Sequence, residues 1–166
     1  MSYILIGGAG FVGSRLREVL PDSIVYDVTS SGNNYCDITN VETFSFPLGC
    51  DDTVVLLAAE HRDDVSPRSR YYTTNVGGTQ SVLDYMDRNG CTKMIFISSV
   101  AVYGLDLNNP SEQSKLNPFN DYGRSKKEAE ACIKDWFDKS PGGKCVSIIG
   151  RRLYLVRVIG VMFLIW

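Results

Sequence analysis

Short runs of apolar residues alternate along this chain with longer segments in which apolar residues recur every three or four positions. The first run, Tyr3–Ile6, ends at a pair of glycines, and the following segment, Phe11–Leu20, has the spacing of a helix. The same two patterns recur downstream. They predict strands at Ile24–Tyr26, Thr53–Ala58, Lys93–Ile97 and Val146–Ile149, and helices at Arg70–Arg88 and Tyr122–Lys139.

The predicted strands are continuously apolar, without the alternation of a strand that has one face in water. Strands of this kind occur in parallel sheets that are covered by helices on both faces. The regular exchange of strands and helices points to the same architecture. We therefore predict an α/β fold, a Rossmann-like doubly wound parallel sheet, formed by residues 1–149 as one domain.

Composition and charge narrow the class of protein. The chain has 166 residues, of which 44% are apolar and 22% are charged, and its net charge is −2, as in a globular domain. This balance indicates neither a nucleic-acid partner nor an anionic membrane surface. The five cysteines are scattered without a Cys-x-x-Cys pair, and His61 is the one histidine. We therefore expect no disulfide framework, no metal site and a cytoplasmic location.

The segment between the first strand and the first helix has the spacing Gly-x-x-Gly-x-x-Gly, at Gly7, Gly10 and Gly13. In a dinucleotide-binding turn one glycine permits the tight turn, one lets a pyrophosphate approach the backbone, and one lets the helix pack closely on the strand. The helix N-terminus offers N–H groups and partial positive charge to the anion. We predict a dinucleotide site here, with Phe11 and Val12 at the helix start.

Asp27 follows the second predicted strand, 20 residues after Gly7. At this position an acid accepts hydrogen bonds from the ribose hydroxyls of the adenosine. A 2′-phosphate would meet a like charge, and residues 28–31 offer no arginine or lysine to neutralise it. We therefore predict NAD rather than NADP as the cofactor.

Tyr122 and Lys126 lie four residues apart at the start of a predicted helix, on one helix face. To exchange protons near neutral pH, a tyrosine needs its pKa lowered from about 10 by about 3 units, or roughly 4 kcal/mol. One cation at about 4 Å and an effective dielectric constant of about 20 supplies about that energy. Lys126 could be that cation. Ser98 and Ser99 follow the strand Lys93–Ile97, beyond the end where ligands bind parallel sheets.

These motifs together resemble the extended short-chain dehydrogenase/reductase family, in its branch of NAD-dependent nucleotide-sugar epimerases and dehydratases. The resembling segments run in the family's order between residues 3 and 149. They are residues 7–13, Asp27, 37–39, 57–59, 75–79, 98–104 and 122–126.

The resemblance implies a role for each matching residue. Tyr122 would be the acid/base, Lys126 would bind the nicotinamide ribose and tune the tyrosine, and Ser99 would orient the 4-hydroxyl of the sugar. Asp37 would meet the adenine amino group, and Asn75 would be structural near the active site. The implied cofactor-binding set is Gly7, Gly10, Phe11, Val12, Gly13, Asp27, Asp37, Ile38, Leu57, Ala58, Ala59, Asn75, Ser98, Tyr122 and Lys126.

One departure from the family's pattern bears on the reaction. In the 4,6-dehydratases the serine segment carries Thr-Asp-Glu, and the two acids eliminate water. Here the matching residues are Ser99, Val100 and Ala101, so a 4-epimerase that works through a 4-keto intermediate fits better. A 4-keto-sugar reductase or dehydratase of the same family, and a non-catalytic dinucleotide-binding module, remain the alternatives.

The resemblance also implies partners, and it identifies residues 150–166 as a departure from the family. The substrate would be a nucleotide-diphosphate sugar, and the helices Arg70–Arg88 and Tyr122–Lys139 would be the candidate surface of a homodimer. Residues 150–166 depart from the family's pattern, which we interpret as an aberrant tail from a reading-frame shift at Ile149 or from truncation, or as a divergent terminus. We expect the chain to lack the substrate domain, to bind NAD weakly and to be inactive alone.

Overall fold

The computed structural model describes residues 1–105, 111–140, 143–151 and 155–159. Within these residues, six strands form one sheet in the order β2-β1-β3-β4-β5-β6. The strands are β1 (Tyr3–Ile6), β2 (Ile24–Tyr26), β3 (Thr53–Leu56), β4 (Lys93–Ser99), β5 (Cys145–Arg151) and β6 (Leu155–Ile159). The first five pair in parallel, and β6 pairs with β5 in the antiparallel direction.

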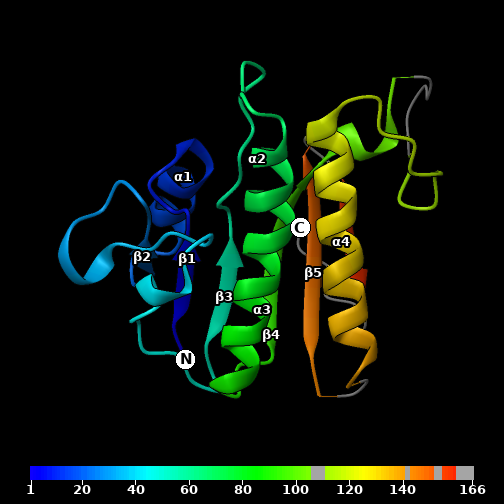
Figure 1. Cartoon of the computed structure of the whole chain (residues 1–166). Coiled ribbons are helices and arrows are strands. Elements are labelled where there is room, and N and C mark those ends of the chain that lie inside the picture. Colours follow the sequence, from blue (N-terminus) through cyan, green and yellow to red (C-terminus); the bar gives the residue numbers. More distant parts are fainter. Residues whose placement is uncertain (106–110, 141–142, 152–154, 160–166) are drawn as a thin grey trace.

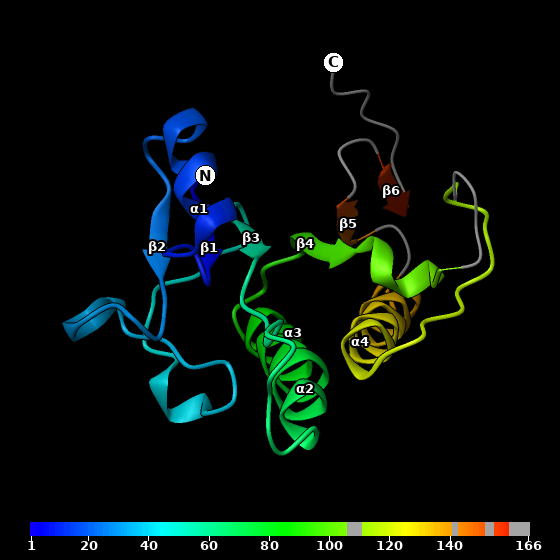
Figure 2. The same cartoon turned by 90° about the horizontal axis from the view of Figure 1, so that it is seen from above.

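Helices lie on both faces of the sheet. Figure 2 shows α1 (Phe11–Val19) on one face, and α2 (Ser69–Tyr72), α3 (Gly78–Arg88) and α4 (Asp121–Asp138) on the other. A π-helical turn at Thr73–Gly77 joins α2 to α3. Short 3-10 helices lie at Gly32–Asn34, Val41–Thr43 and Val100–Tyr103.

The main core lies between the sheet and the pair α3 and α4, which run side by side in front of the strands in Figure 1. Alternate residues of β1, β3, β4 and β5 face these helices. The strands contribute Ile4, Ile6, Val54, Leu56, Met94, Phe96, Val146 and Ile148, and the helices contribute Val82, Leu83, Met86, Ala129, Ile133 and Trp136. Complete burial of a large aliphatic side chain stabilises the fold by about 1.5–3 kcal/mol. This packed layer therefore holds the strands, and with them their carboxyl ends, in fixed positions.

The predicted α/β fold with a Rossmann-like parallel sheet is confirmed. The predicted helix Arg70–Arg88 is present, but its π-helical turn was not predicted. The strand β6 was not predicted either; only residues 152–154 separate it from β5 in sequence, too few for the crossover that a parallel pair requires.

The predicted domain boundary at residue 150 falls inside β5. Of the predicted aberrant tail, residues 152–154 and 160–166 lie outside the described part of the chain.

Candidate dinucleotide and catalytic site

A cleft of about 910 Å³ opens at the carboxyl ends of the parallel strands, where ligands bind in open α/β sheets. Its wall contains residues from the glycine turn, from the segments after β2 and β3, and from β4 and α4. It holds every predicted site residue except Asn75. The predicted residues on it are Gly7, Gly10, Phe11, Val12, Gly13, Asp27, Asp37, Ile38, Leu57, Ala58, Ala59, Ser98, Ser99, Tyr122 and Lys126.

The three glycines of the turn have different surroundings. Gly7 has a φ of +82°, and a Cβ there would stand 2.3 Å from the Ala58 nitrogen, so it makes the tight turn against the end of β3. A Cβ on Gly13 would stand 2.3 Å from the Gly8 oxygen, which allows α1 to pack directly on the turn. A Cβ on Gly10 would meet nothing closer than 3.9 Å.

The surroundings of Gly10 fit a bound pyrophosphate. Gly10 lines the cleft and is the N-cap residue of α1, which has no side-chain cap. The first N–H groups of a helix have no partner within the helix, and a helix N-terminus favours an anion. The bare backbone of Gly10 therefore leaves room for a phosphate at a helix end that no side chain covers.

Asp27 is buried, and the protein already uses much of its hydrogen-bonding capacity. One carboxylate oxygen accepts hydrogen bonds from the Thr29 N–H and hydroxyl, both at 2.9 Å. The other oxygen accepts from the Ala9 N–H at 3.0 Å. Because each carboxylate oxygen has two lone pairs, the oxygen facing Ala9 keeps capacity for a ribose hydroxyl. Asp27 thus ties the segment after β2 to the glycine turn.

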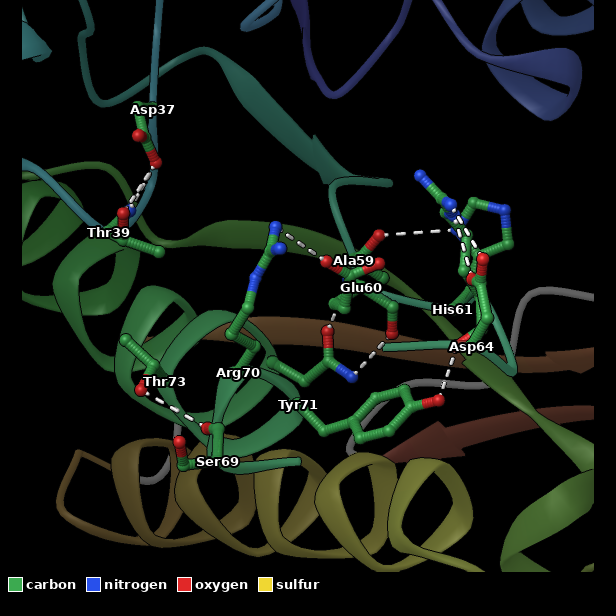
Figure 3. A network of polar contacts seen from close by, with 12 residues as sticks. Asp37, Thr39, Ala59, Glu60, His61, Asp64, Ser69, Arg70, Tyr71 and Thr73 are labelled. Carbon is green, nitrogen blue, oxygen red and sulfur yellow. Dashed lines mark hydrogen bonds and ion pairs between the residues drawn. The ribbon is translucent and has the colours of Figure 1, made fainter. Parts of the chain in front are cut away.

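Asp37 stands further along the same wall of the cleft. Its Oδ1 accepts hydrogen bonds from the Thr39 N–H at 2.9 Å and from the Thr39 hydroxyl at 2.8 Å (Figure 3). Buried Ile38 lies between the two, against Gly78 at the start of α3. This packing fixes the segment, so the carboxylate of Asp37 has a defined orientation toward the cleft.

Tyr122 and Ser99 come together in the cleft from α4 and from the end of β4. Asn120 caps α4 through the Gly123 N–H at 2.8 Å and thereby fixes the turn that carries Tyr122. Burial raises the pKa of Tyr122, and a hydrogen bond with the Ser99 hydroxyl lowers it. The Ser99 oxygen also accepts a hydrogen bond from the Ala101 N–H at 3.2 Å, which orients the hydroxyl.

The predicted tuning of Tyr122 by Lys126 stays a prediction. The net change in the Tyr122 pKa is upward, because the effect of burial outweighs that of the hydrogen bond with Ser99. The Lys126 Nζ donates to the Ile97 carbonyl at 2.7 Å and stands 4.0 Å from the centroid of the Phe96 ring. Burial lowers the pKa of Lys126 to about 7, and the carboxylate of Glu130 opposes this change. These two contacts hold the lysine side chain against β4. The spacing of residues in the sequence does not indicate either contact.

Asn75 lies behind the cleft wall rather than on it. Its side chain accepts from the Glu60 N–H at 2.8 Å, and it donates to the Glu60 carbonyl at 3.0 Å and to the Ser125 hydroxyl at 2.9 Å. The structural role implied for Asn75 agrees with these contacts. No contact with a ligand follows from its place, because it does not line the cleft.

Several cleft residues were missed by the sequence analysis. Arg70, Thr73 and Thr74 reach the cleft from α2 and the π-helical turn, and their spacing of three and four residues could have identified them as one helix face. Figure 3 shows Arg70 extending toward Glu60, with its guanidinium 3.1 Å from the carboxylate. His61 also lines the cleft, which the sequence analysis did not predict, and its Nδ1 lies 3.3 Å from the Ala59 carbonyl oxygen.

The model of the NAD dependent epimerase/dehydratase family matches residues 3–157 of this chain. The chain therefore belongs to that family, as the resemblance of its motifs implies. Among the described residues, no helix has the length and apolar character needed to cross a membrane.

Two curated relatives illustrate the likeness. The chain is 44% identical over 154 residues to an N-acetyl-α-D-glucosaminyl-diphospho-ditrans,octacis-undecaprenol 4-epimerase of Escherichia coli O157:H7, and this match covers 88% of the chain and 46% of the relative. It is 32% identical to a UDP-glucose 4-epimerase of Lactobacillus helveticus, with 89% of the chain and 50% of the relative covered. The chain thus spans about half the length of these relatives.

Solved structures agree with the fold. A UDP-glucose 4-epimerase of Brucella ovis in complex with NAD is 32% identical, with a TM-score of 0.73, and the match covers 89% of this chain and 50% of that one. A dTDP-glucose 4,6-dehydratase of Streptomyces venezuelae with NAD bound is 27% identical, with a TM-score of 0.77 and coverage of 89% and 54%.

Proposed function

We propose that this chain carries the NAD-binding and catalytic half of a sugar 4-epimerase. The observation that carries the proposal is the meeting, in one cleft, of an uncapped helix start behind Gly10, of Asp27, and of Ser99 and Tyr122. The NAD-bound structure of a 4-epimerase with the same fold supports it. Asp27, without a nearby basic residue in its segment, favours NAD over NADP.

The chemistry divides between cofactor and protein. NAD, held by the glycine turn and by Asp27, would supply a group that accepts a hydride from sugar C4 and can return it to either face of the ketone. Tyr122 takes the proton of the 4-hydroxyl as the ketone forms and returns it to the same oxygen when the hydride comes back. The Ser99 hydroxyl holds Tyr122 and the sugar oxygen in one hydrogen-bonded group. No atom is lost or gained by the sugar, so the reaction needs no further acid.

The residues beside Ser99 favour epimerisation over dehydration. Val100 and Ala101 begin the 3-10 helix after β4 and have aliphatic side chains, which cannot take part in proton transfer. Elimination of water needs an acid and a base in addition to Tyr122. The 4-keto-sugar reductase and the non-catalytic binding module stay as the alternatives.

A nucleotide-diphosphate sugar is the first substrate class, as in the UDP-glucose 4-epimerases. A second class is a sugar linked through a diphosphate to a polyprenol, and one observation favours it. The relative with that substrate in its name is 44% identical to this chain, against 32% for the UDP-glucose 4-epimerase above. Both classes share a hexose on a diphosphate, and the reaction at C4 changes the hexose alone.

Calorimetric titration of the purified chain with NAD and with NADP tests the cofactor. We expect NAD to bind at least about tenfold more tightly, or about 1.4 kcal/mol, and Asp27→Asn to reduce the preference. Equal affinities, or no heat with either from a folded sample, would refute the dinucleotide site.

Incubation of the NAD-loaded chain with UDP-N-acetylglucosamine and with its polyprenol-diphosphate counterpart tests the reaction. The appearance of the NADH absorbance band would show oxidation at the sugar. We predict no net turnover by the chain alone. Tyr122→Phe, made in a longer protein that carries this chain and the substrate domain, separates enzyme from binding module: it should abolish turnover and leave NAD binding nearly unchanged.

A further inference from the structure

A charged group that the proposed reaction does not use lies directly beneath the cleft. Glu130 of α4 is only 8% exposed, and its Oε1 accepts a hydrogen bond from the Ser98 hydroxyl. Aspartate and glutamate are almost never buried without a compensating partner. We therefore expect the buried carboxylate of Glu130 to interact with polar or charged groups of the protein.

Lys126 stands one helical turn before Glu130 on α4. Residues four apart lie on the same helix face, and Lys126 is 2% exposed. Its Nζ is held by the Ile97 carbonyl and lies over the Phe96 ring, both on β4. These partners are a carbonyl and a ring, and neither carries a formal charge. Among the described residues, Glu130 is the one charged group that shifts the titration of Lys126.

Ser98 completes the cluster from the other side. It is 4% exposed and is the residue of β4 that follows Ile97, the acceptor of the lysine. Ser98 also lines the cleft, so its hydroxyl connects the buried carboxylate to the wall of the site. The Glu130 carboxylate therefore contacts Ser98 directly and lies one helical turn from Lys126 on α4.

We propose that Glu130 is a positioning residue of the site: its buried carboxylate favours the protonated form of Lys126 beneath the cleft and holds the Ser98 hydroxyl against α4. This inference rests on the proposed function for the use of a charged Lys126, because the lysine is the residue expected to meet the nicotinamide ribose. The burial of Lys126 favours the neutral amine, and with the opposing effect of Glu130 included the pKa of Lys126 is about 7. Without the carboxylate, most of the lysine would be uncharged at neutral pH.

The primary test measures the titration of Lys126 directly and needs no ligand. Lysine labelled with ¹³C at Cε is followed by NMR against pH, and the Lys126 signal is assigned by its loss in Lys126→Arg. Glu130→Gln should lower the midpoint of Lys126 by about one pH unit or more. Glu128→Gln is the matched control, because Glu128 is exposed on the same helix. It should leave the midpoint within about 0.2 of the unaltered chain, since exposed charges are screened.

Two further variants separate charge from shape. Glu130→Asp keeps the carboxylate, so the Lys126 midpoint in this variant should lie closer to that of the unaltered chain than to that of Glu130→Gln. Ser98→Ala removes the hydrogen bond and keeps the charge, so it should move the midpoint less than Glu130→Gln does. A folded Glu130→Gln with an unchanged midpoint, or an equal fall in Glu130→Asp, would overturn the proposal.

A measurement on the unaltered chain covers the case in which Glu130→Gln does not fold. With glutamate labelled at Cδ, the Glu130 carboxyl signal should move through the same pH range in which Lys126 titrates. A carboxyl signal that stays still through that range would overturn the proposal as well.

Cofactor binding gives the functional readout. We expect Glu130→Gln to weaken NAD binding several-fold at pH 8 and less at pH 6, where a larger share of the lysine is charged in both proteins, whereas Glu128→Gln should bind like the unaltered chain. Loss of pH dependence in Glu130→Gln with an unaltered Lys126 midpoint counts against the inference. Absence of NAD binding by the unaltered chain, with the midpoint shift present, counts against the proposed function alone.

Discussion

The Asn75 side chain donates a hydrogen bond to the Ser125 hydroxyl at 2.9 Å, and both residues are buried. This contact joins the π-helical turn before α3 to the first turns of α4, between Tyr122 and Lys126. The same amide group holds the backbone of Glu60 after β3 through two more hydrogen bonds. One side chain therefore sets the distance between the cofactor side of the cleft and the helix that carries the reactive tyrosine.

Replacement of Asn75 tests this joint. Asn75→Ala leaves the partly buried Glu60 N–H and carbonyl without their partners, which costs about 2–4 kcal/mol of unfolding free energy. Chemical denaturation measures it. Asn89→Ala is the control, because Asn89 is exposed and makes one hydrogen bond to its own helix; it should cost less than about 1 kcal/mol. Equal losses in the two variants would show that the joint does not stabilise the fold.

Two glycines of the turn should respond differently to the same change. In Gly13→Ala the new methyl group would stand 2.3 Å from the Gly8 oxygen, so α1 must move, at a cost of about 1–3 kcal/mol. In Gly10→Ala the methyl group meets no atom within 3.8 Å, and Gly10 lines the cleft. We expect a change below about 1 kcal/mol but a large loss of NAD affinity. Thermal unfolding and calorimetry on both variants distinguish these effects; full NAD affinity in Gly10→Ala would contradict the phosphate position.

The sequence predicted the parts of the site that local spacing determines. The glycine turn, Asp27 and the pair Tyr122 and Lys126 sit at fixed distances from strand ends or within one helix turn, and all of them reach the cleft. Local spacing could not predict the partners of Lys126, because the Ile97 carbonyl and the Phe96 ring belong to β4, which is distant in the sequence. The packing of α4 on the sheet determines these contacts.

The sequence analysis also did not predict two elements whose apolar residues show weak periodicity. The π-helical turn at Thr73–Gly77 changes the helix face presented to the cleft, and nothing in the spacing of apolar residues signals it. The strand β6 lies in an apolar segment without a period of two, so its antiparallel pairing with β5 was not foreseen. The separate tail from residue 150 stays a prediction, although β5 runs through Gly150 and Arg151.

The Ser99 hydroxyl should control the acidity of Tyr122. Its hydrogen bond lowers the pKa of Tyr122 against the upward effect of burial, so Ser99→Ala should raise that pKa further. The tyrosinate absorbance of each protein, minus that of the same protein with Tyr122→Phe, isolates this one tyrosine. Saturating NAD should lower the Tyr122 pKa, because its positive nicotinamide ring favours the tyrosinate. A fall in the pKa of Tyr122 in Ser99→Ala would show that the hydroxyl stabilises the neutral phenol instead.

The buried ammonium of Lys126 should make the fold less stable in acid than in mild base. Its pKa is lowered to about 7 in the folded chain, mainly by burial, and is about 10.4 in an unfolded chain. Between these values the unfolded state binds more protons, so the unfolding free energy rises with pH from about 7 to about 10. The desolvation cost is fully present below pH 7 and amounts to at most about 5 kcal/mol, at 1.36 kcal/mol for each pKa unit.

Lys126→Met removes the titration while keeping most of the apolar volume. The slope of unfolding free energy against pH between about 7 and 10 should then decrease by close to one proton. Below pH 7 the variant should gain stability, less what the hydrogen bond to the Ile97 carbonyl contributed, which is about 1.5–3 kcal/mol for a charged donor. Urea unfolding at several pH values measures both effects. Lys127→Met, at an exposed neighbouring position, is the control and should keep the slope; an unchanged slope in Lys126→Met would show that the lysine titrates as it does in water.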